Sequence, residues 1–241
     1  MPKLKRPVPD ISPDVDRLLR SVIESRERFS ILQVGAFDGV TNDPLHDLTR
    51  DYRQVHAVLL EPQAEPFAEL QARWRDSPRV VPLRFALAGT SGEQPLFVVA
   101  EAFRHLHPFA GQIASFSRAH VESECARYIW RPPADLVRPI AVPTIDWRTL
   151  VDRHGPFDFV TIDVEGYDGE VIHQMDLSTG APEVIQYEHR HVPRDMERRS
   201  IERLERSHYA VWRINKADTL AVRSETAAFD EARARLGPPT R

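Results

Sequence analysis

Two short segments of this chain carry residues that could bind a nucleoside. The segment from Gln33 to Gly39 follows an apolar run and contains two glycines. A hydrophobic strand that ends in a glycine turn before a helix exposes backbone N–H groups at a ligand-sized crevice. Glu61 and Pro62 close the next apolar run, where a carboxylate can accept both hydroxyls of a ribose. This spacing predicts binding of a nucleoside-containing cofactor.

The glycine turn favours a cationic ligand over a dinucleotide. The dinucleotide fingerprint, G-x-G-x-x-G, has three glycines, whereas this chain has Ala36 or Phe37 where the middle one is needed. Asp38 would repel a phosphate, but its carboxylate suits the amino group and sulfonium of S-adenosylmethionine. The alternative interpretations are structural: an ordinary tight turn between strand and helix, and, for Glu61, a surface acid at the start of a helix.

Further acidic residues follow two later apolar runs. Asp163 ends one run and Glu165 comes two positions later, while Tyr187, Glu188 and His189 end the other run. The carboxyl ends of the strands form the ligand crevice of an open α/β sheet, so these side chains are candidates for binding and catalysis. We predict that Asp163 takes part in cofactor binding and in catalysis. We predict that Glu165 and Tyr187 contact the substrate.

His189 is the predicted general base. An alcohol nucleophile must lose a proton, best to a group whose pKa lies near the working pH. Glu188 would orient His189 or contact the substrate. Two alternatives stay open for His189: it is an exposed loop residue, or the acceptor is a carboxylate that needs no base and His189 only binds it.

The same acidic residues suggest a second alternative, a divalent metal site. Asp163, Glu188 and His189, together with Glu165, could form an oxygen-rich site that lowers the pKa of a substrate hydroxyl. Because the spacing alone does not establish such a site, we predict no metal. Mg²⁺ at Asp163, Glu188 and His189 stays as the less favoured alternative.

The segment from about residue 90 to about residue 143 is rich in aromatic residues and histidines. We predict that it caps the crevice, and we assign substrate contacts to Ser115 and His120. His105 and His107 do not predict a zinc site, because neither thiolates nor a second spaced histidine pair lie near them in the sequence. The structural alternative is a small core around an antiparallel strand pair, with its histidines on the surface.

Apolar runs that alternate with helical patterns must position these residues. The predicted strands are 31–34, 56–60, 80–87, 157–163, 184–188, 209–214 and 219–223, and the predicted helices are 14–28, 42–53, 65–76, 145–154, 167–175 and 194–207. This alternation predicts an α/β fold with a doubly wound, Rossmann-like parallel sheet. The last two strands form a hairpin that ends the chain, and residues 95–100 pair with residues 138–142.

The domain organisation follows from this pattern. We expect residues 1–29 to form an N-terminal tail and helix. Residues 30–241 form the second unit, a single α/β domain, and the insertion at about residues 90–143 is its substrate cap.

The composition excludes several classes of protein. The net charge is −4, from 32 basic and 36 acidic residues, so no basic surface for a nucleic acid is expected. Cys125 is the only cysteine, which excludes an intrachain disulfide and argues against an iron–sulfur cluster. No run reaches the roughly 20 apolar residues of a membrane span. We expect a cytoplasmic protein with a small-molecule substrate and with neither nucleic acid nor membrane as partner. A homo-oligomer stays open.

Four motifs occur in the order seen in FkbM-type methyltransferases. They are Gly35-Ala36-Phe37-Asp38-Gly39, Leu60-Glu61-Pro62, Thr144-Ile145-Asp146 and Ile162-Asp163-Val164-Glu165-Gly166. The chain resembles this family from about residue 31 to about residue 214. The family is similar to other class I S-adenosylmethionine-dependent enzymes, which implies a seven-stranded sheet that ends in an antiparallel hairpin. Its members mostly methylate hydroxyls of sugars and natural products.

The resemblance implies roles for individual residues. Gly35 to Gly39 would line the methionine moiety, and Glu61 would hold the ribose. Ala86 and Leu87, which follow the third predicted strand, would face the adenine.

Gln33 departs from the family pattern, which often has an acid there that helps to bind the methionine amino group. Gln33 can accept a hydrogen bond but brings no charge. We hypothesise that Asp38 compensates for the missing acid.

The sequence thus predicts an S-adenosylmethionine-dependent O-methyltransferase of natural product biosynthesis. The methyl group would pass by in-line displacement to a hydroxyl of a small metabolite, sugar or natural product. Methylation of nitrogen or of a carboxyl group stays open. Two alternatives belong to other classes. One is an NAD(P)-dependent oxidoreductase, which the missing third glycine disfavours. The other is a catalytically silent methyltransferase-like binding protein, which Gln33 favours and the retained acids disfavour.

Overall fold

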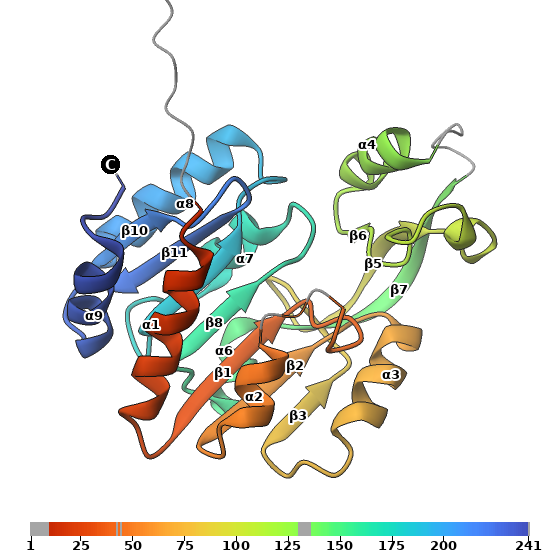
Figure 1. Ribbon diagram of the computed structural model, residues 1–241. Coiled ribbons are helices and arrows are strands. Elements are labelled where there is room, and N and C mark those ends of the chain that lie inside the picture. Colours follow the sequence, from red (N-terminus) through yellow and green to blue (C-terminus); the bar gives the residue numbers. More distant parts are fainter. Residues whose placement is uncertain (1–9, 42, 44, 130–135, 241) are drawn as a thin grey trace, which may run out of the picture.

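The computed structural model describes residues 10–41, 43, 45–129 and 136–240 of the chain. Figure 1 shows a twisted central sheet with helices on both faces, and a smaller sheet that stands to one side of it. Among the described helices, none combines the length and the apolar character that crossing a membrane requires.

The central sheet has seven strands. In spatial order they are β10 (Tyr209–Arg213), β11 (Asp218–Arg223), β9 (Val184–Glu188), β8 (Phe159–Ile162), β1 (Phe29–Val34), β2 (Val55–Leu60) and β3 (Val80–Leu83). Neighbouring strands are parallel, except that β11 is antiparallel to both β10 and β9. The predicted doubly wound sheet with a terminal antiparallel hairpin is confirmed. The chain order reverses between β1 and β8, which opens a crevice at their carboxyl ends.

Two buried apolar layers cover the sheet, one on each face. Alternate residues of β1 point into different layers: Ile31 belongs to one cluster and Leu32 to the other. The helices of the first layer are α1 (Ser12–Glu24), α2 (His46–Asp51), α3 (Ala64–Trp74) and α9 (Ala227–Leu236). The helices of the second layer are α6 (Trp147–His154), α7 (Asp168–Gln174) and α8 (Arg194–Arg206). Every residue of β8 is buried because both of its faces are covered.

The insertion forms a second sheet of four strands. Its spatial order is β4 (Ala86–Leu87), β7 (Val137–Ile145), β5 (Gly92–Val99) and β6 (Ala114–Ser115). The predicted antiparallel pair is confirmed and extends further than predicted, from Gly92 opposite Thr144 to Val99 opposite Val137. A 3₁₀ helix, η1 (Glu101–Leu106), and an α-helix, α4 (Arg118–Tyr128), complete the insertion. Val121 and Cys125 of α4 belong to a small buried cluster of the insertion's own residues.

Three predictions about the elements were wrong. The predicted strand 80–87 is two strands, β3 and β4, because the chain turns at Phe85 and leaves the central sheet to pair with β7. Helix α4 was missed, since its apolar residues form no continuous stripe and Glu124 is one of its three buried positions. Helix α9 was also missed, and it follows the hairpin that was expected to end the chain. The start of the predicted helix 42–53 includes positions 42 and 44, which lie outside the described residues.

Candidate active site

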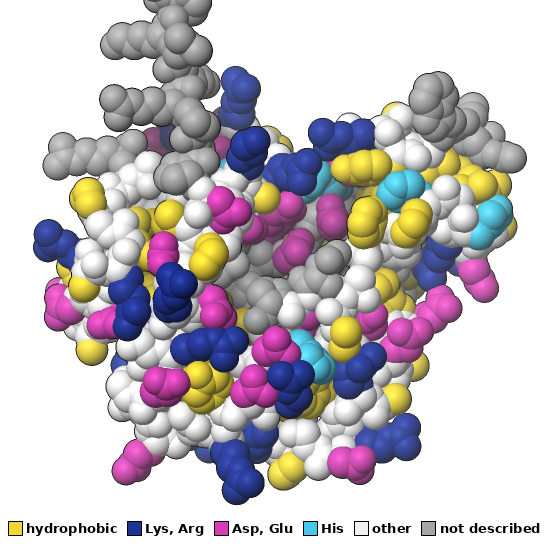
Figure 2. Space-filling model, in the orientation of Figure 1, with side chains coloured by type: hydrophobic (Ala, Val, Ile, Leu, Met, Phe, Trp, Pro, Cys, Tyr) yellow, Lys and Arg dark blue, Asp and Glu magenta, His cyan; other side chains and the backbone are white. Residues whose placement is uncertain are grey.

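A cavity of about 600 Å³ lies at the carboxyl ends of the central strands. Its walls come from the turn after β1, the residue after β2, the loops after β8 and β9, and the insertion. Figure 2 shows acidic side chains gathered around a hollow between the central domain and the insertion. The cavity therefore lies where the reversal of strand order predicts a ligand site.

The turn after β1 lets two strands approach closely at the cavity wall. Gly35 has a φ of +87°, and a Cβ atom there would lie 2.0 Å from the backbone oxygen of Asp163. Ala36 and Phe37 also line the cavity. Gly39 has a φ of +72° and does not line it; a Cβ there would meet Leu70 of α3 at 2.6 Å. The first glycine thus shapes the site, and the second lets the turn pack on a helix.

Glu61 lines the cavity with only 4% of its surface exposed. Its Oε2 accepts a hydrogen bond from the Phe37 N–H at 3.0 Å, and its Oε1 accepts one from the Gln63 N–H at 2.8 Å. Burial raises the pKa of Glu61 to about 7. Pro62, Ala86 and Leu87, which were predicted to bind the cofactor together with Glu61, also line the cavity.

A carboxylate lies beside Gln33, but it belongs to Asp43. The Gln33 Nε2 donates to Asp43 Oδ1 at 3.2 Å, and both residues line the cavity. The Leu45 N–H donates to the same oxygen at 2.8 Å, and burial raises the pKa of Asp43. Sequence reasoning missed Asp43, because it placed this residue in the predicted helix 42–53, whereas helix α2 begins only at His46.

Asp38 was predicted to compensate for the missing acid at position 33. Instead, both of its carboxylate oxygens accept hydrogen bonds within its own turn. Its Oδ1 accepts hydrogen bonds from the Val40 and Thr41 N–H groups at 2.9 and 2.8 Å. Its Oδ2 accepts one from the Thr41 hydroxyl at 2.6 Å. Asp38 is not among the described residues that line the cavity. The geometry therefore places the acid near Gln33 at Asp43 instead.

Four acids, Asp163, Glu165, Glu188 and Asp218, line the part of the cavity beyond the glycine turn, and their negative charges affect one another. Asp163 is accessible from the cavity but surrounded by protein on its other sides, and this enclosure, with Glu165 and Asp218, raises its pKa to about 7. Burial, with the charges of Asp163 and Glu165, raises the pKa of Glu188 to about 8. Tyr187 is buried and also contributes to the wall.

His189, the predicted general base, does not reach the acidic residues of the cavity. Its Nδ1 lies 2.9 Å from the Thr219 hydroxyl of β11, and His189 is not among the described lining residues. Burial, together with the positive charge of Arg213, lowers the pKa of His189 to about 4. A group with so low a pKa is a weak base near neutral pH.

His191 reaches the cavity in place of His189. Its Nε2 lies 3.6 Å from Glu188 Oε1, and its Nδ1 lies 3.6 Å from Glu124 Oε1 of α4. Strand β9 ends at Glu188, so the alternation of side chains stops there and could not predict which of the two histidines points inward.

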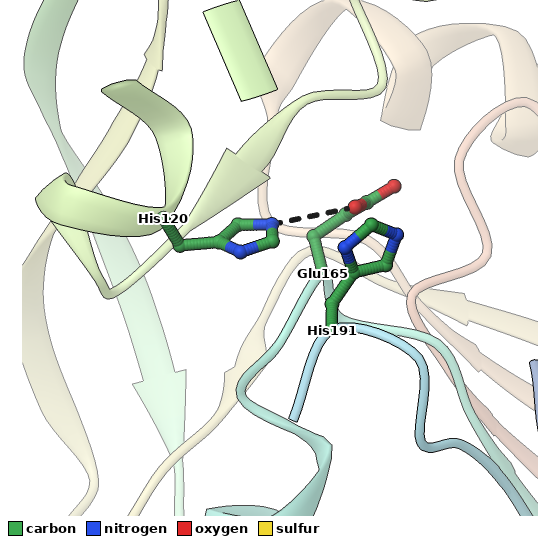
Figure 3. Close-up of side chains that lie close together, drawn as sticks. All are labelled: His120, Glu165 and His191. Atoms are coloured by element: carbon green, nitrogen blue, oxygen red, sulfur yellow. Dashed lines mark ion pairs between the residues drawn. The ribbon is translucent and has the colours of Figure 1, made fainter. Parts of the chain in front are cut away.

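The insertion contributes polar residues to the same region. Ser115 is buried, lines the cavity and accepts a hydrogen bond from the Ser117 N–H at 3.2 Å. His120 is not among the described lining residues, but its Nε2 lies 3.5 Å from Glu165 Oε2 (Figure 3). Glu124 lines the cavity and was missed, because α4 itself was not predicted.

Several solved structures have a similar fold. FkbM methyltransferase from Methylobacillus flagellatus KT is 13% identical with a TM-score of 0.44, and the match covers 81% of this chain and 44% of that one. Precorrin-6y C5,15-methyltransferase from Geobacter metallireducens GS-15 is 10% identical with a TM-score of 0.42, covering 88% of each chain. Aeropyrum pernix fibrillarin, solved with natively bound S-adenosyl-L-methionine, is 11% identical with a TM-score of 0.40, covering 86% of this chain and 73% of that one.

The sequence itself places the chain in a family. No curated protein matches it. The family described as "Methyltransferase FkbM domain" matches residues 33–227, which include the glycine turn, Glu61 and the acids after β8 and β9. The chain therefore belongs to the FkbM methyltransferase family.

Proposed function

We propose that this protein transfers the methyl group of S-adenosylmethionine to a hydroxyl of a small metabolite, sugar or natural product. The observation that carries the proposal is the division of one cavity into two halves. One half has a glycine turn and the buried Glu61, and the other has Asp163, Glu188 and His191. Membership in a methyltransferase family supports the same reaction class.

The residues of the first half fit S-adenosylmethionine. Gly35 lets its turn pack against the Asp163 backbone, where a side chain would clash, and this packing places the backbone of Gly35, Ala36 and Phe37 along the cavity wall. Glu61 can accept the ribose hydroxyls while the Phe37 and Gln63 N–H groups hold its carboxylate in place. Asp43 and Gln33 together offer an acidic partner for the methionine amino group.

The second half of the cavity suits a hydroxylated acceptor. S-adenosylmethionine supplies an electrophilic methyl carbon, and the carboxylates of Asp163 and Glu188 would favour the positive charge of its sulfonium. These side chains follow the ends of the neighbouring strands β8 and β9 and line the same cavity, where an acceptor bound beside them could attack the methyl carbon in line. His191, next to Glu188, is placed to take the hydroxyl proton, a role the sequence assigned to His189.

Calorimetric titration with S-adenosylmethionine tests the first half of the proposal. We expect one molecule to bind per chain, and Glu61→Gln to weaken binding at least tenfold, because a charged acceptor of two hydrogen bonds is lost. Glu69→Gln, an exposed glutamate of α3, is the matched control and should bind as the wild type does. A wild-type protein that binds no S-adenosylmethionine would sink the proposal, and binding of NADH instead would favour an oxidoreductase.

Formation of S-adenosylhomocysteine tests the second half. A panel of sugars and phenolic and aliphatic alcohols should contain acceptors that raise its rate above the rate without acceptor. Amines and carboxylic acids of matched size are the controls. If only these controls are methylated, the choice of a hydroxyl acceptor is wrong while methyl transfer stands.

A further inference from the structure

Two histidines and a glutamate from three separate segments meet beside the cavity. His120 comes from α4 of the insertion, Glu165 from the turn after β8, and His191 from the loop after β9. One ligand atom of each lies within 4.8 Å of the other two, and Figure 3 shows the three side chains turned toward a common point. The two imidazole rings meet edge to face, with their centres 5.2 Å apart.

The backbone of the turn after β8 is shaped to bring these residues together. Glu165 has a φ of +50°, which is uncommon for a residue with a side chain, and Gly166 follows with a φ of +84°. A Cβ atom at Gly166 would lie 3.1 Å from His120 Nδ1 and 3.1 Å from the His191 carbonyl oxygen. The absent side chain therefore lets both histidine segments pack against the backbone next to Glu165. Backbone strain of this kind gathers at functional sites.

His120 lacks the hydrogen bond that its position requires. Its Nε2 is buried, and it makes no hydrogen bond within the part of the chain that the structure describes. The Glu165 carboxylate lies 3.5 Å away, which is beyond a good hydrogen bond but close to the separation of two ligands on one metal ion. Ligands about 2.0–2.2 Å from a tetrahedral ion are roughly 3.4 Å from each other. A ring nitrogen of His191 lies within 4.8 Å of the ligand atoms of both.

A second layer of carboxylates surrounds His191. Glu124 Oε1 lies 3.6 Å from its Nδ1, and Glu188 Oε1 lies 3.6 Å from its Nε2. Glu124 and Glu188 are 10% and 16% exposed, so solvent screens their charges weakly. One nitrogen of His191 would hold the ion, and the carboxylate beside the other nitrogen would orient the ring and raise its basicity. The remaining carboxylate would lie close to the ion, where its negative charge attracts a cation.

We propose that His120, Glu165 and His191 bind a divalent transition-metal ion of the zinc type. Two imidazoles and one carboxylate suit Zn²⁺, Co²⁺ or Fe²⁺, whereas Mg²⁺ and Ca²⁺ take mostly oxygen ligands. These residues differ from the Asp163, Glu188 and His189 set that the sequence suggested for Mg²⁺, in which His189 turns to Thr219.

Such an ion would have two effects. It would join α4 of the insertion to the two loops of the central sheet and so fix one wall of the cavity. Glu165 and His191 line the cavity, so an open position on the ion would face the acceptor. There the ion would lower the pKa of a bound hydroxyl. With the ion bound, His191 would be a ligand instead of the base, and the proton would leave to a neighbouring carboxylate such as Glu188. This second effect rests on the proposed methyl transfer, whereas metal binding itself does not.

The visible absorption of Co²⁺ tests the site directly, because Co²⁺ with four or five ligands absorbs more strongly than hydrated Co²⁺. Zn²⁺ absorbs no visible light and competes for the same site. We expect chelator-treated full-length protein to bind one equivalent of Co²⁺, with absorption that one equivalent of Zn²⁺ removes and millimolar Mg²⁺ does not. Glu165→Gln and His120→Ala should each weaken Co²⁺ binding at least tenfold. His105→Ala is the matched control, since this exposed histidine lies in η1 of the same insertion.

The outcomes separate metal binding from folding and from methyl transfer. Melting temperatures without metal show whether each variant folds, and Glu165→Gln keeps the volume of the side chain. The proposal is overturned if the wild type takes up no stoichiometric Co²⁺, or if Glu165→Gln and His120→Ala bind it as tightly as His105→Ala does. Binding of S-adenosylmethionine is titrated separately with the metal-free protein. The metal site and the proposed methyl transfer can therefore be contradicted independently of each other.

Discussion

Gly35 and Asp163 are in such close contact that a Cβ atom at position 35 would lie 2.0 Å from the Asp163 backbone oxygen. The contact joins the turn after β1 to the end of β8, the two strands between which the order of the sheet reverses. The half of the cavity proposed for the cofactor and the half proposed for the acceptor therefore share a wall whose geometry depends on the absence of a side chain at Gly35.

Gly35→Ala should damage both stability and cofactor binding. The new methyl group meets backbone, which cannot move aside as a flexible side chain can, and a φ of +87° is itself unfavourable for alanine. We expect a loss of at least about 2 kcal/mol in the free energy of unfolding. Urea denaturation measures it. Gly89→Ala is the control, because its nearest neighbour would be Gln174 Nε2 at 4.0 Å. An unchanged urea midpoint for Gly35→Ala would contradict the contact.

Asp43→Asn should weaken S-adenosylmethionine binding more than Asp38→Asn does. Asp43 lies beside Gln33 in the cavity, whereas Asp38 holds the Val40 and Thr41 N–H groups of its own turn. Loss of a charged partner for the amino group predicts a weakening of about tenfold or more. S-adenosylhomocysteine keeps the amino group but lacks the sulfonium charge, so its affinity should fall by the same factor. Calorimetry that found the larger loss for Asp38→Asn would restore the sequence-based hypothesis.

The stability of the ligand-free protein should fall as Glu61 ionises. Burial raises the pKa of Glu61 to about 7 in the folded protein, from an ordinary value of 4.5. Between these values the folded state holds a proton that the unfolded state has lost, so this contribution is full below pH 4.5 and disappears as the pH rises through 7. The substitution Glu61→Gln removes this pH-dependent contribution to stability.

Urea denaturation from pH 5 to pH 8 measures this effect. The free energy of unfolding of the wild type, relative to Glu61→Gln, should fall by up to about 3 kcal/mol over that range. Other carboxyls that titrate in the same window, including Glu188, are present in both proteins and cancel. A difference that stays constant with pH would contradict the raised pKa.

The imidazole of His189 should stay neutral across the range in which enzymes usually work. Its pKa is lowered to about 4 by burial and by the charge of Arg213. In proton–carbon correlation spectra, its ring signals, assigned through His189→Asn, should not move between pH 5.5 and pH 8. His105, which is exposed, provides the comparison signal in the same spectra. A midpoint near pH 6.5 for His189 would make it a candidate base again.

Periodicity predicted the central sheet well because its strands are long apolar runs between helices. The strand at Val184–Glu188 was predicted with the bounds that the structure shows, since both faces of β9 are covered. Helix α9 was not predicted, because its buried residues, Ala228 and Ala232, are small and form no clear apolar stripe. Helix α4 was not predicted for a related reason. A charged residue, Glu124, is among its buried positions and interrupts the apolar pattern.

The candidate site was harder to predict than the sheet, because its side chains lie where regular structure ends. Gly35 and Glu61 follow directly after strands, so the strand direction places them at the crevice. His189 and His191 lie beyond the end of β9, where hydrogen bonds from the His189 and Arg190 N–H groups to the Ala217 carbonyl oxygen set the path of the chain. Such contacts between distant segments leave no pattern in the local sequence.

The paired strands β5 and β7 make the insertion a module. Gly92 and Thr144, the ends of the pairing nearest the central sheet, lie opposite each other, so the chain leaves the sheet and returns to it at one place. Ser91 and Asp146 hydrogen-bond just outside this pair, and Asp146 caps α6 by accepting from the Thr149 N–H at 2.9 Å. The path of the chain through the central sheet is therefore the same whatever the length of the segment beyond this pair. A change in that segment would reshape one wall of the cavity and leave Gly35 and Glu61 of the central domain where they are.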